Sequence, residues 1–455
     1  MNLSTPKNIH FVGVAGTGMS AIAQYLAQTG HHITGSDRDF GKPNLQQTQQ
    51  QLEACGIICV PQNGEIITAN LDAVVVSSAI ENTIPDMAKA LELGIPLLHR
   101  ADMLKYITDT KKTIAFSGTS GKSSTAAIAF HIMLACGCQP SLITGAGLVS
   151  LQQQGLIGNA YVGNGQWLII EADESDGTLV KYHPQIGVLL NLDKDHKEMS
   201  ELYEIFETFK TNTELLIVNN SQAEAAKYST NIKNNFGASN WVGYQYANFG
   251  QQPHGIQFTI NNIPFNVPLL GYHNMENVVA AVAAVCQTGL LTVQACVEAA
   301  KTYQGIYRRL QLLGTKKGAT IIDDYAHNPV KIAAAINTFK PLTNKIIAWF
   351  QPHGYGPTKF LRADFVHEIT KTLRPTDEIW MSEIYYAGGT AVKDISAQDL
   401  INDIKTKHPN AYFVANRNNL AAQMQTHITN GAIVLLMGAR DPSLAHFAQE
   451  FYENL

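Results

Sequence analysis

The stretch IAFSGTSGKSST, residues 114–125, has the residue types and spacing of a turn that binds phosphate. Its apolar start predicts a buried strand, its glycines predict a tight turn, and the Ala-rich residues that follow predict a helix. Glycines let backbone N–H groups converge on an anion, and a helix N-terminus adds partial positive charge. Lys122 is placed to reach β- and γ-phosphate oxygens, and Ser123 to contact Mg²⁺. Phe116 stands where the strict motif has glycine, so a glycine turn with a chance Gly-Lys-Ser is the alternative.

Two further predicted strands run into acidic loops. WLIIEAD, residues 167–173, begins a loop that carries Glu171, Asp173, Glu174 and Asp176, and IGVLLNLDKDH, residues 186–196, ends at Asp195 and His196. We expect these strands to be adjacent and parallel, which brings both loops close to the phosphate loop. Because Mg²⁺ takes oxygen ligands and keeps several waters, one or two carboxylates suffice, and Glu171 is the first choice. A solvated acidic loop is the alternative.

Two motifs between residues 271 and 311 carry side chains that suit a nucleotide. GYHNMEN supplies His273, Asn274 and Asn277, whose imidazole and amide groups match the edge of a base. In GIYRRLQ, Arg308 or Arg309 is suited to the charge that develops on a transferred phosphoryl group. A surface ion pair is the alternative for the arginines.

Three predicted strand ends in the last third of the chain are polar. They carry Asp323, Asp324, Tyr325, His327 and Asn328 in DDYAHNP, His353 and Tyr355 in FQPHGYGPTK, and Glu383 and Tyr385 in SEIYYAGGT. Any one histidine could be structural, but three polar strand ends in one domain predict a common site.

The glycines near the N-terminus predict a second phosphate-binding turn. Gly13, Gly16 and Gly18 follow an apolar strand in the order G-x-x-G-x-G, which is a weak nicotinamide fingerprint but suits the first turn of a Rossmann-like unit. Asp37, after the next predicted strand, is placed to meet a ribose hydroxyl. A tight turn with no ligand, or an oxidoreductase site, is the alternative.

These elements predict an α/β protein of three domains. Strands alternate with helices from residue 8 onward, so we expect a Rossmann-like N-terminal domain over residues 1–110. A central P-loop ATPase domain with a parallel sheet is expected over 111–313, and a C-terminal Rossmann-like domain over 314–455.

Composition excludes several classes of protein. The chain has 455 residues, 45% of them hydrophobic, and a net charge of -5, which gives no basic surface for nucleic acid. We expect a cytoplasmic protein because no signal peptide or apolar run of membrane-spanning length is apparent. The six cysteines fall in no C-x-x-C pair or zinc spacing and are expected to be buried free thiols.

Taken together, the motifs resemble those of the Mur ligase family. They occur in order along almost the whole chain: GVAGTGMSAIA, VVSSAI, GTSGKSST, EADESD, the Asp-His of NLDKDH, HNMEN, YRRLQ, DDYAHNP, FQPH, EIYYAG and GARD. The resemblance implies an ATP- and Mg²⁺-dependent ligase of peptidoglycan precursor synthesis, which joins an amino acid or peptide to the carboxylate of UDP-N-acetylmuramate through an acyl phosphate. Among its members, those that add L-alanine are the most similar. A muropeptide-recycling ligase, a ligase for another acid or amine, and a non-catalytic nucleotide sensor are the alternatives. The resemblance implies no nucleic-acid or membrane partner, and we expect a monomer or homodimer.

The resemblance also implies roles for individual residues. The residues implied in catalysis are Lys122, Glu171, His196, Arg309, His327 and His353, and those implied at the metal are Ser123, Glu171 and His196. The residues implied at ATP are Gly118, Thr119, Ser120, Gly121, Lys122, Ser123, Ser124, His273, Asn274, Asn277, Arg309 and Asp324. The residues implied at the two other substrates are Gly16, Thr17, Gly18, Met19, Ser20, Asp37, Ser77, Ser78, Tyr325, His327, His353 and Tyr355.

The chain departs from the family at the expected amino-acid site. Alanine-adding members usually continue Gln-Pro-His with two arginines that hold the carboxylate of the amino acid, and here those positions are Gly354 and Pro357. Losing such a clamp costs about 1.5 to 3 kcal/mol unless another cation replaces it. Lys359 and Arg362 are the candidates. Which amine is accepted is therefore less firmly predicted than the type of reaction. Lys210 is near the position of a carbamylated lysine of sister ligases, and we expect it to be solvated.

Overall fold

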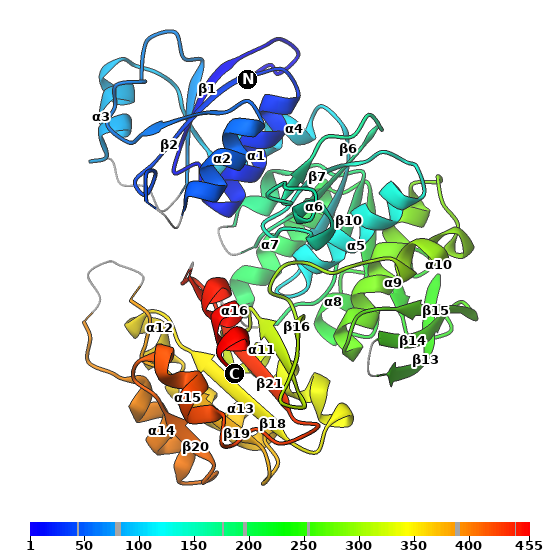
Figure 1. Cartoon of the computed structure of the whole chain (residues 1–455). Coiled ribbons are helices and arrows are strands. Elements are labelled where there is room, and N and C mark those ends of the chain that lie inside the picture. The colour runs from blue at the N-terminus through cyan, green and yellow to red at the C-terminus, as the bar shows by residue number, and fades with distance from the viewer. Residues whose placement is uncertain are drawn as a thin grey trace. The chain divides into compact units, whose positions relative to one another are not determined.

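The computed structural model of the chain contains two compact units (Figure 1). Unit 1 comprises residues 1–250, 255–269 and 273–306, and unit 2 comprises 251–254, 270–272 and 307–455. The structure describes all residues except 43–44, 78–82, 175–176, 194–197, 253–254, 387–391 and 442. The predicted limit between residues 313 and 314 falls inside a strand of unit 2, and the three domain limits stay a prediction.

Unit 1 begins with a five-stranded parallel sheet in the order β3-β2-β1-β4-β5. Its strands are β1 (Asn8–Val12), β2 (His32–Asp37), β3 (Ile58–Pro61), β4 (Ala73–Val76) and β5 (Leu97–His99). Its helices are α1 (Thr17–Gln28), α2 (Gln46–Ala54), α3 (Pro85–Glu92) and α4 (Arg100–Thr108). Alternate residues of β1 point to opposite faces, so Phe11 packs with α1, α2 and α4, while Val12 packs with α3. This part of the fold is doubly wound, as predicted.

The second sheet of unit 1 has six strands in the order β11-β10-β6-β9-β7-β8. They are β6 (Lys112–Ser117), β7 (Ser141–Ile143), β8 (Ala160–Tyr161), β9 (Trp167–Glu171), β10 (Ile186–Leu189) and β11 (Leu215–Val218). Between them lie α5 (Lys122–Ala135), α6 (Val149–Gln152), the 3₁₀ turn η2 (Thr178–Lys181), α7 (Met199–Asn212) and α8 (Ala223–Ala226). The expected adjacency of β9 and β10 is wrong, because β6 lies between them and pairs with both. Their loops therefore flank the phosphate loop from its two sides.

A small four-stranded sheet and two long helices complete unit 1. The strands are β12 (Phe236–Gly237), β13 (Tyr244–Gln252), β14 (Gly255–Ile260) and β15 (Ile263–Val267), and the helices are α9 (Tyr272–Gln287) and α10 (Val293–Lys301). One hydrophobic cluster joins α5, α9 and α10 to one face of β6, through Phe116 among others. A second cluster joins α7 to the other face of β6 and also contains residues of α1 and α4. This shared core explains why residues 1–110 and the central region form one compact unit.

Unit 2 is built on a six-stranded sheet in the order β16-β17-β21-β18-β19-β20, parallel except for the edge strand β16. The strands are β16 (Gln311–Lys316), β17 (Ala319–Asp324), β18 (Ile346–Gln351), β19 (Glu378–Met381), β20 (Ala411–Phe413) and β21 (Ile433–Gly438). The helices are α11 (Pro329–Phe339), η3 (Lys340–Leu342), α12 (Tyr355–Phe360), α13 (Arg362–Thr372), α14 (Ala397–Lys405), η4 (Arg417–Asn419), α15 (Leu420–Met424) and α16 (Leu444–Asn454). One core cluster contains α11, α13 and α14, and another contains α15 and α16, so helices cover both faces as predicted.

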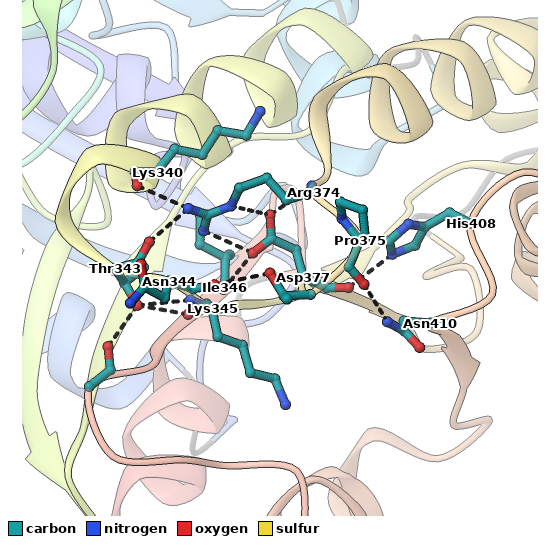
Figure 2. A network of polar contacts seen from close by, with 12 residues as sticks. Lys340, Thr343, Asn344, Lys345, Ile346, Arg374, Pro375, Asp377, His408 and Asn410 are labelled. Atoms are coloured by element: carbon teal, nitrogen blue, oxygen red, sulfur yellow. Dashed lines mark hydrogen bonds and ion pairs between the residues drawn. The ribbon is translucent and has the colours of Figure 1, made fainter.

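A polar network fixes the edge of the unit 2 sheet where β18 and β19 begin (Figure 2). The fully buried carboxylate of Asp377 accepts hydrogen bonds from the Arg374 guanidinium at 2.9 and 3.0 Å and from the Ile346 backbone N–H at 2.8 Å. The same guanidinium donates to the carbonyls of Lys340 and Thr343. Since parallel sheets bind ligands at the carboxyl ends of their strands, this network at the opposite edge serves stability.

Two expectations from composition are tested by the described residues. Among them, no helix combines the length and the apolar character that crossing a membrane requires. All six cysteines are free thiols, as predicted. The expectation that they are buried holds for Cys296, whereas the other five are half-buried.

Candidate functional site in the two units

The predicted phosphate loop joins β6 to α5 in unit 1. Gly118 and Gly121 have φ angles of 130° and 86°, and Gly121 is the N-cap of α5. A Cβ atom at Gly121 would lie 2.6 Å from Oδ1 of Asn277, so both the conformation and the space favour glycine there. The loop therefore has the strand, turn and helix order that its sequence predicts.

Asn191, on the loop after β10, holds the phosphate loop in place. Its Oδ1 accepts hydrogen bonds from the Thr119 hydroxyl at 2.9 Å and from the Ser120 backbone N–H at 2.8 Å. Its Nδ2 donates to the Ser120 carbonyl at 3.0 Å. Sequence reasoning missed this residue, although its position directly after a buried strand was a usable signal. Ser124 lies on the first turn of α5 and is half-buried.

Lys122 and Ser123 contact the acidic residues that follow β9. The Lys122 ammonium donates to the Gly118 carbonyl at 2.7 Å and to Oε2 of Glu174 at 2.6 Å, and Asp173 lies 3.5 Å away. The Ser123 hydroxyl donates to the carboxylate of Glu171, the last residue of β9. A hydroxyl and a carboxylate oxygen side by side at a helix N-terminus are hard oxygen donors, which suits Mg²⁺.

Burial and the nearby carboxylates have opposite effects on the pKa of Lys122. Burial disfavours the charge on Lys122, but the carboxylates of Glu174 and Asp173 outweigh it and raise the pKa of the ammonium group. Burial raises the pKa of Glu174 against the effect of Lys122. We regard the pair as ionised, because two hydrogen bonds and a second carboxylate surround the ammonium group.

The three residues predicted at the nucleotide base lie at the start of α9. Asn277 is buried, and its Oδ1 accepts from the Thr125 hydroxyl of α5 at 3.2 Å. Its Nδ2 donates to Oδ1 of Asn274 at 3.1 Å. Asn277 thus packs beneath the phosphate loop and supports it, whereas His273 is exposed.

The N-terminal glycine turn lies between β1 and α1. The backbone N–H groups of Gly13 and Val14 donate to the Ser36 carbonyl at 2.8 and 3.0 Å. The carboxylate of Asp37 accepts from the Ala15 N–H at 3.3 Å, and burial raises its pKa. Asp37 therefore supports the turn itself.

The residues of the glycine turn and of the first turn of α1 differ in how deeply they are buried. Gly16, Thr17 and Gly18 are half-buried or exposed, whereas Met19 and Ser20 are buried in the core. Ser77 is half-buried directly after β4, and Ser78 lies outside the described residues.

Two residues that sequence reasoning missed contact this turn. Arg100, at the start of α4, lies so close to Gly18 that a Cβ atom there would be 2.5 Å from Nη1 of Arg100. Asn159 is buried and donates through Nδ2 to the Thr17 carbonyl at 2.8 Å and to the Ser20 hydroxyl at 2.9 Å. An arginine against a glycine turn is suited to phosphate. No motif in the single sequence marked either residue.

In unit 2, the arginine pair predicted near the phosphates precedes β16 and β17. Arg308 is buried and forms a bidentate ion pair with Asp323, with Nε–Oδ2 at 2.9 Å and Nη2–Oδ1 at 3.2 Å. The guanidinium of Arg309 lies 5.0 Å from the centre of the Tyr325 ring. The carboxylate of Asp324 accepts hydrogen bonds from the backbone N–H groups of Leu310 and Ala326, and burial raises its pKa. Arg308 thus has a structural role, and Arg309 is the better candidate of the two for contact with a phosphoryl group.

The residues predicted at the amine substrate gather at the carboxyl ends of β17 and β18. The ring of His327 lies 5.6 Å from that of Tyr325 and 5.7 Å from that of His353. Burial lowers the pKa of His327, which keeps the imidazole neutral at physiological pH. Tyr385 joins the group through the backbone, since the Gly354 N–H donates to its carbonyl at 2.9 Å, and Tyr355 is half-buried at the start of α12.

The two candidate replacements for the missing arginines are engaged elsewhere. Lys359 forms an ion pair with Asp394, and Arg362 donates through Nε to Asp403 at 2.7 Å. Lys210 pairs with Glu207 on the same helix, 2.9 Å away, and its side chain is 28% exposed, so it is less solvated than expected. The predicted site residues Asp176, Asp195 and His196 lie outside the described residues.

A phosphate loop at the carboxyl end of a buried parallel strand places the chain among the P-loop α/β proteins. Three family models match it: "Mur ligase family, catalytic domain" over residues 8–112, "Mur ligase middle domain" over 116–285, and "Mur ligase, glutamate ligase domain" over 308–440. The chain belongs to the Mur ligase family.

Relatives and solved structures agree with this assignment. The chain is 31% identical to a UDP-N-acetylmuramate–L-alanine ligase of Dictyoglomus turgidum, over 95% of this chain and 94% of the relative. It is 33% identical to the enzyme of that name from Alkaliphilus metalliredigens, over 96% and 95%. In fold it is similar to the UDP-N-acetylmuramate-alanine ligase of Thermotoga maritima (TM-score 0.81, 23% identity, 98% of each chain). It is also similar to a murein peptide ligase of Psychrobacter arcticus (TM-score 0.66, 19% identity, 98% of each chain).

Proposed function

We propose that the protein is a cytoplasmic ligase that uses ATP to join L-alanine to the carboxylate of UDP-N-acetylmuramate in peptidoglycan precursor synthesis. One observation carries the proposal. Lys122 and Ser123, at the start of α5, contact the carboxylates of Glu174 and Glu171, and a nucleotide phosphate and its metal ion are expected at this place. Identity of about 30% over nearly the whole chain to ligases of that name supports the choice of substrates.

The residues of unit 1 serve the phosphoryl donor and the acid. The phosphate loop and Lys122 bind the β- and γ-phosphates, and Ser123 and Glu171 would hold Mg²⁺, which would supply positive charge to neutralise the phosphates. Glycine turn residues 16–18, together with Arg100, bind the UDP-sugar. A carboxylate oxygen of the sugar attacks the γ-phosphorus atom, ADP leaves, and an acyl phosphate forms.

The residues of unit 2 serve the second half of the reaction. The amine of L-alanine attacks the acyl carbon, and the tetrahedral intermediate expels phosphate. Arg309 neutralises phosphoryl charge, and His327 and His353 face the amine. Since both halves of the reaction need charge neutralisation and positioning rather than an enzymic nucleophile, these residue types are sufficient.

The test is ADP release by the purified protein with MgATP and UDP-N-acetylmuramate, across the twenty amino acids and a muropeptide tripeptide. We expect release with L-alanine and none with Lys122→Ala, which removes the phosphate-binding ammonium group. Release with a different amine would mean that Gly354 and Pro357 mark a changed specificity. No release with any amine would contradict the proposed function.

A further inference from the structure

Carboxylates of the protein itself surround the lysine of the phosphate loop. Three acidic residues, Glu171, Asp173 and Glu174, surround the one ammonium group of Lys122. A lysine ammonium has three N–H donors, and here two of them point to the Gly118 carbonyl and to Glu174. An oxygen of Asp173 lies 3.5 Å from the same ammonium group. A phosphate oxygen that binds Lys122 therefore competes with these partners for the ammonium group.

The two ion-pair partners differ in how readily they separate from Lys122. The side chain of Glu174 is 5% exposed and 2.6 Å from the ammonium group, whereas that of Asp173 is 41% exposed and 3.5 Å away. Releasing Glu174 would leave a buried carboxylate without a counter-charge, which is strongly unfavourable. The Asp173 carboxylate is the more exposed and the more distant of the two, so separating it from Lys122 costs less.

We propose that Glu174 is a positioning residue that keeps its ion pair with Lys122 when nucleotide binds, and that Asp173 is the carboxylate that the nucleotide phosphate displaces. The inference rests on the proposed function, since it assumes that the loop binds ATP. It assigns opposite roles to two neighbouring carboxylates. Glu174 aids nucleotide binding by fixing the ammonium group, and Asp173 competes with the phosphate for it.

The test compares Glu174→Gln with Asp173→Asn in the full-length protein, using MgADP as the probe in calorimetric titrations. We expect Asp173→Asn to tighten MgADP binding by about two- to fivefold, because an exposed competing charge is removed. We expect Glu174→Gln to weaken binding by at least about tenfold, because the lysine loses its buried anchor. Thermal unfolding and binding of UDP-N-acetylmuramate to each variant control for the fold.

A conservative variant separates positioning from a merely structural role. Glu174→Asp keeps a carboxylate at this position, so it should recover part of the MgADP affinity that Glu174→Gln loses. A merely structural defect at this buried position would weaken binding in both variants.

Two results would overturn the proposal: wild-type MgADP affinity in Glu174→Gln, or weaker MgADP binding in Asp173→Asn. The Asp173→Asn measurement tests the proposal even if Glu174→Gln does not fold. The Asp173 side chain is 41% exposed, so we expect this variant to fold. A wild-type protein that binds no MgADP would instead contradict the proposed function.

Discussion

At the scale of single residues, the position of Glu171 depends on a glycine that no motif marks. The carboxylate of Glu171 faces the Ser123 hydroxyl on one side, and on another side it approaches Gly145. A Cβ atom at Gly145 would lie 2.3 Å from Oε1 of Glu171. An alanine at residue 145 would therefore force this carboxylate to move.

We predict that Gly145→Ala displaces Glu171 and lowers kcat/KM for MgATP by roughly ten- to a hundredfold, because small displacements at a reacting centre are costly. The measurement is the steady-state rate of ADP release at varied Mg²⁺ and ATP. Gly250→Ala is the matched control, since a Cβ atom there meets nothing within 4 Å. Equal rates in both variants would show that Glu171 does not need this space.

At the scale of elements, His131 joins two helices of unit 1. Its Nε2 lies 3.0 Å from the Ala299 carbonyl and from the Thr302 hydroxyl, so it connects α5 to α10 and the residues after it. Burial lowers the pKa of His131 below 6.5, against the effect of the hydrogen bond to Ala299. The folded protein therefore holds this imidazole neutral.

The pKa of His131 predicts a pH dependence of stability. Below pH 6.5 the unfolded chain binds a proton that the folded chain does not, so the free energy of unfolding falls as pH drops through 6.5. His131→Gln should make the unfolding midpoint fall less between about pH 7.5 and 5.5, by the share of this one group, because His31, His273 and His327 also have lowered pKa values. His446→Gln, at a residue whose side chain is 76% exposed, should leave the curve as in the wild type. Identical curves in all three proteins would refute the assignment.

The network around Asp377 fixes the start of β18 and β19 (Figure 2). Asp377→Ala leaves the Arg374 guanidinium without its carboxylate and should lower the free energy of unfolding by about 3 kcal/mol. Asp394→Ala breaks an ion pair whose side chains are 60% and 45% exposed and should lower the free energy of unfolding much less than Asp377→Ala does. Urea unfolding of both variants measures the difference. If the two variants lose the same stability, the network does not hold the sheet.

At the scale of the whole molecule, the fold followed from alternating apolar strands and helices, and the phosphate loop from its local spacing. Gly118, Lys122 and Ser123 lie on a turn and a helix that follow one another in sequence, so local sequence patterns were sufficient to predict their positions. The order of strands in the central sheet could not be predicted from local spacing, because it depends on long-range pairing. The position of β6 between β9 and β10 was therefore not predicted.

Residues that act across the fold were harder to predict. Asn191, Asn159 and Arg100 contact loops that are distant in sequence, and their types are common in ordinary loops and helix ends. Lys359 and Arg362 matched the expected charge for a carboxylate clamp, but nearby carboxylates pair with both. Residue type alone could not indicate that their charges were already balanced.

The path of one oxygen atom through the reaction distinguishes an acyl-phosphate route from other routes. UDP-N-acetylmuramate labelled with ¹⁸O in its carboxylate should be incubated with the protein, MgATP and L-alanine, and both products analysed by mass spectrometry. If the carboxylate attacks ATP and the amine then expels phosphate, we expect the alanine amide and one ¹⁸O atom in each phosphate released. Amide formed with unlabelled phosphate, or no amide with any amine, would contradict the account.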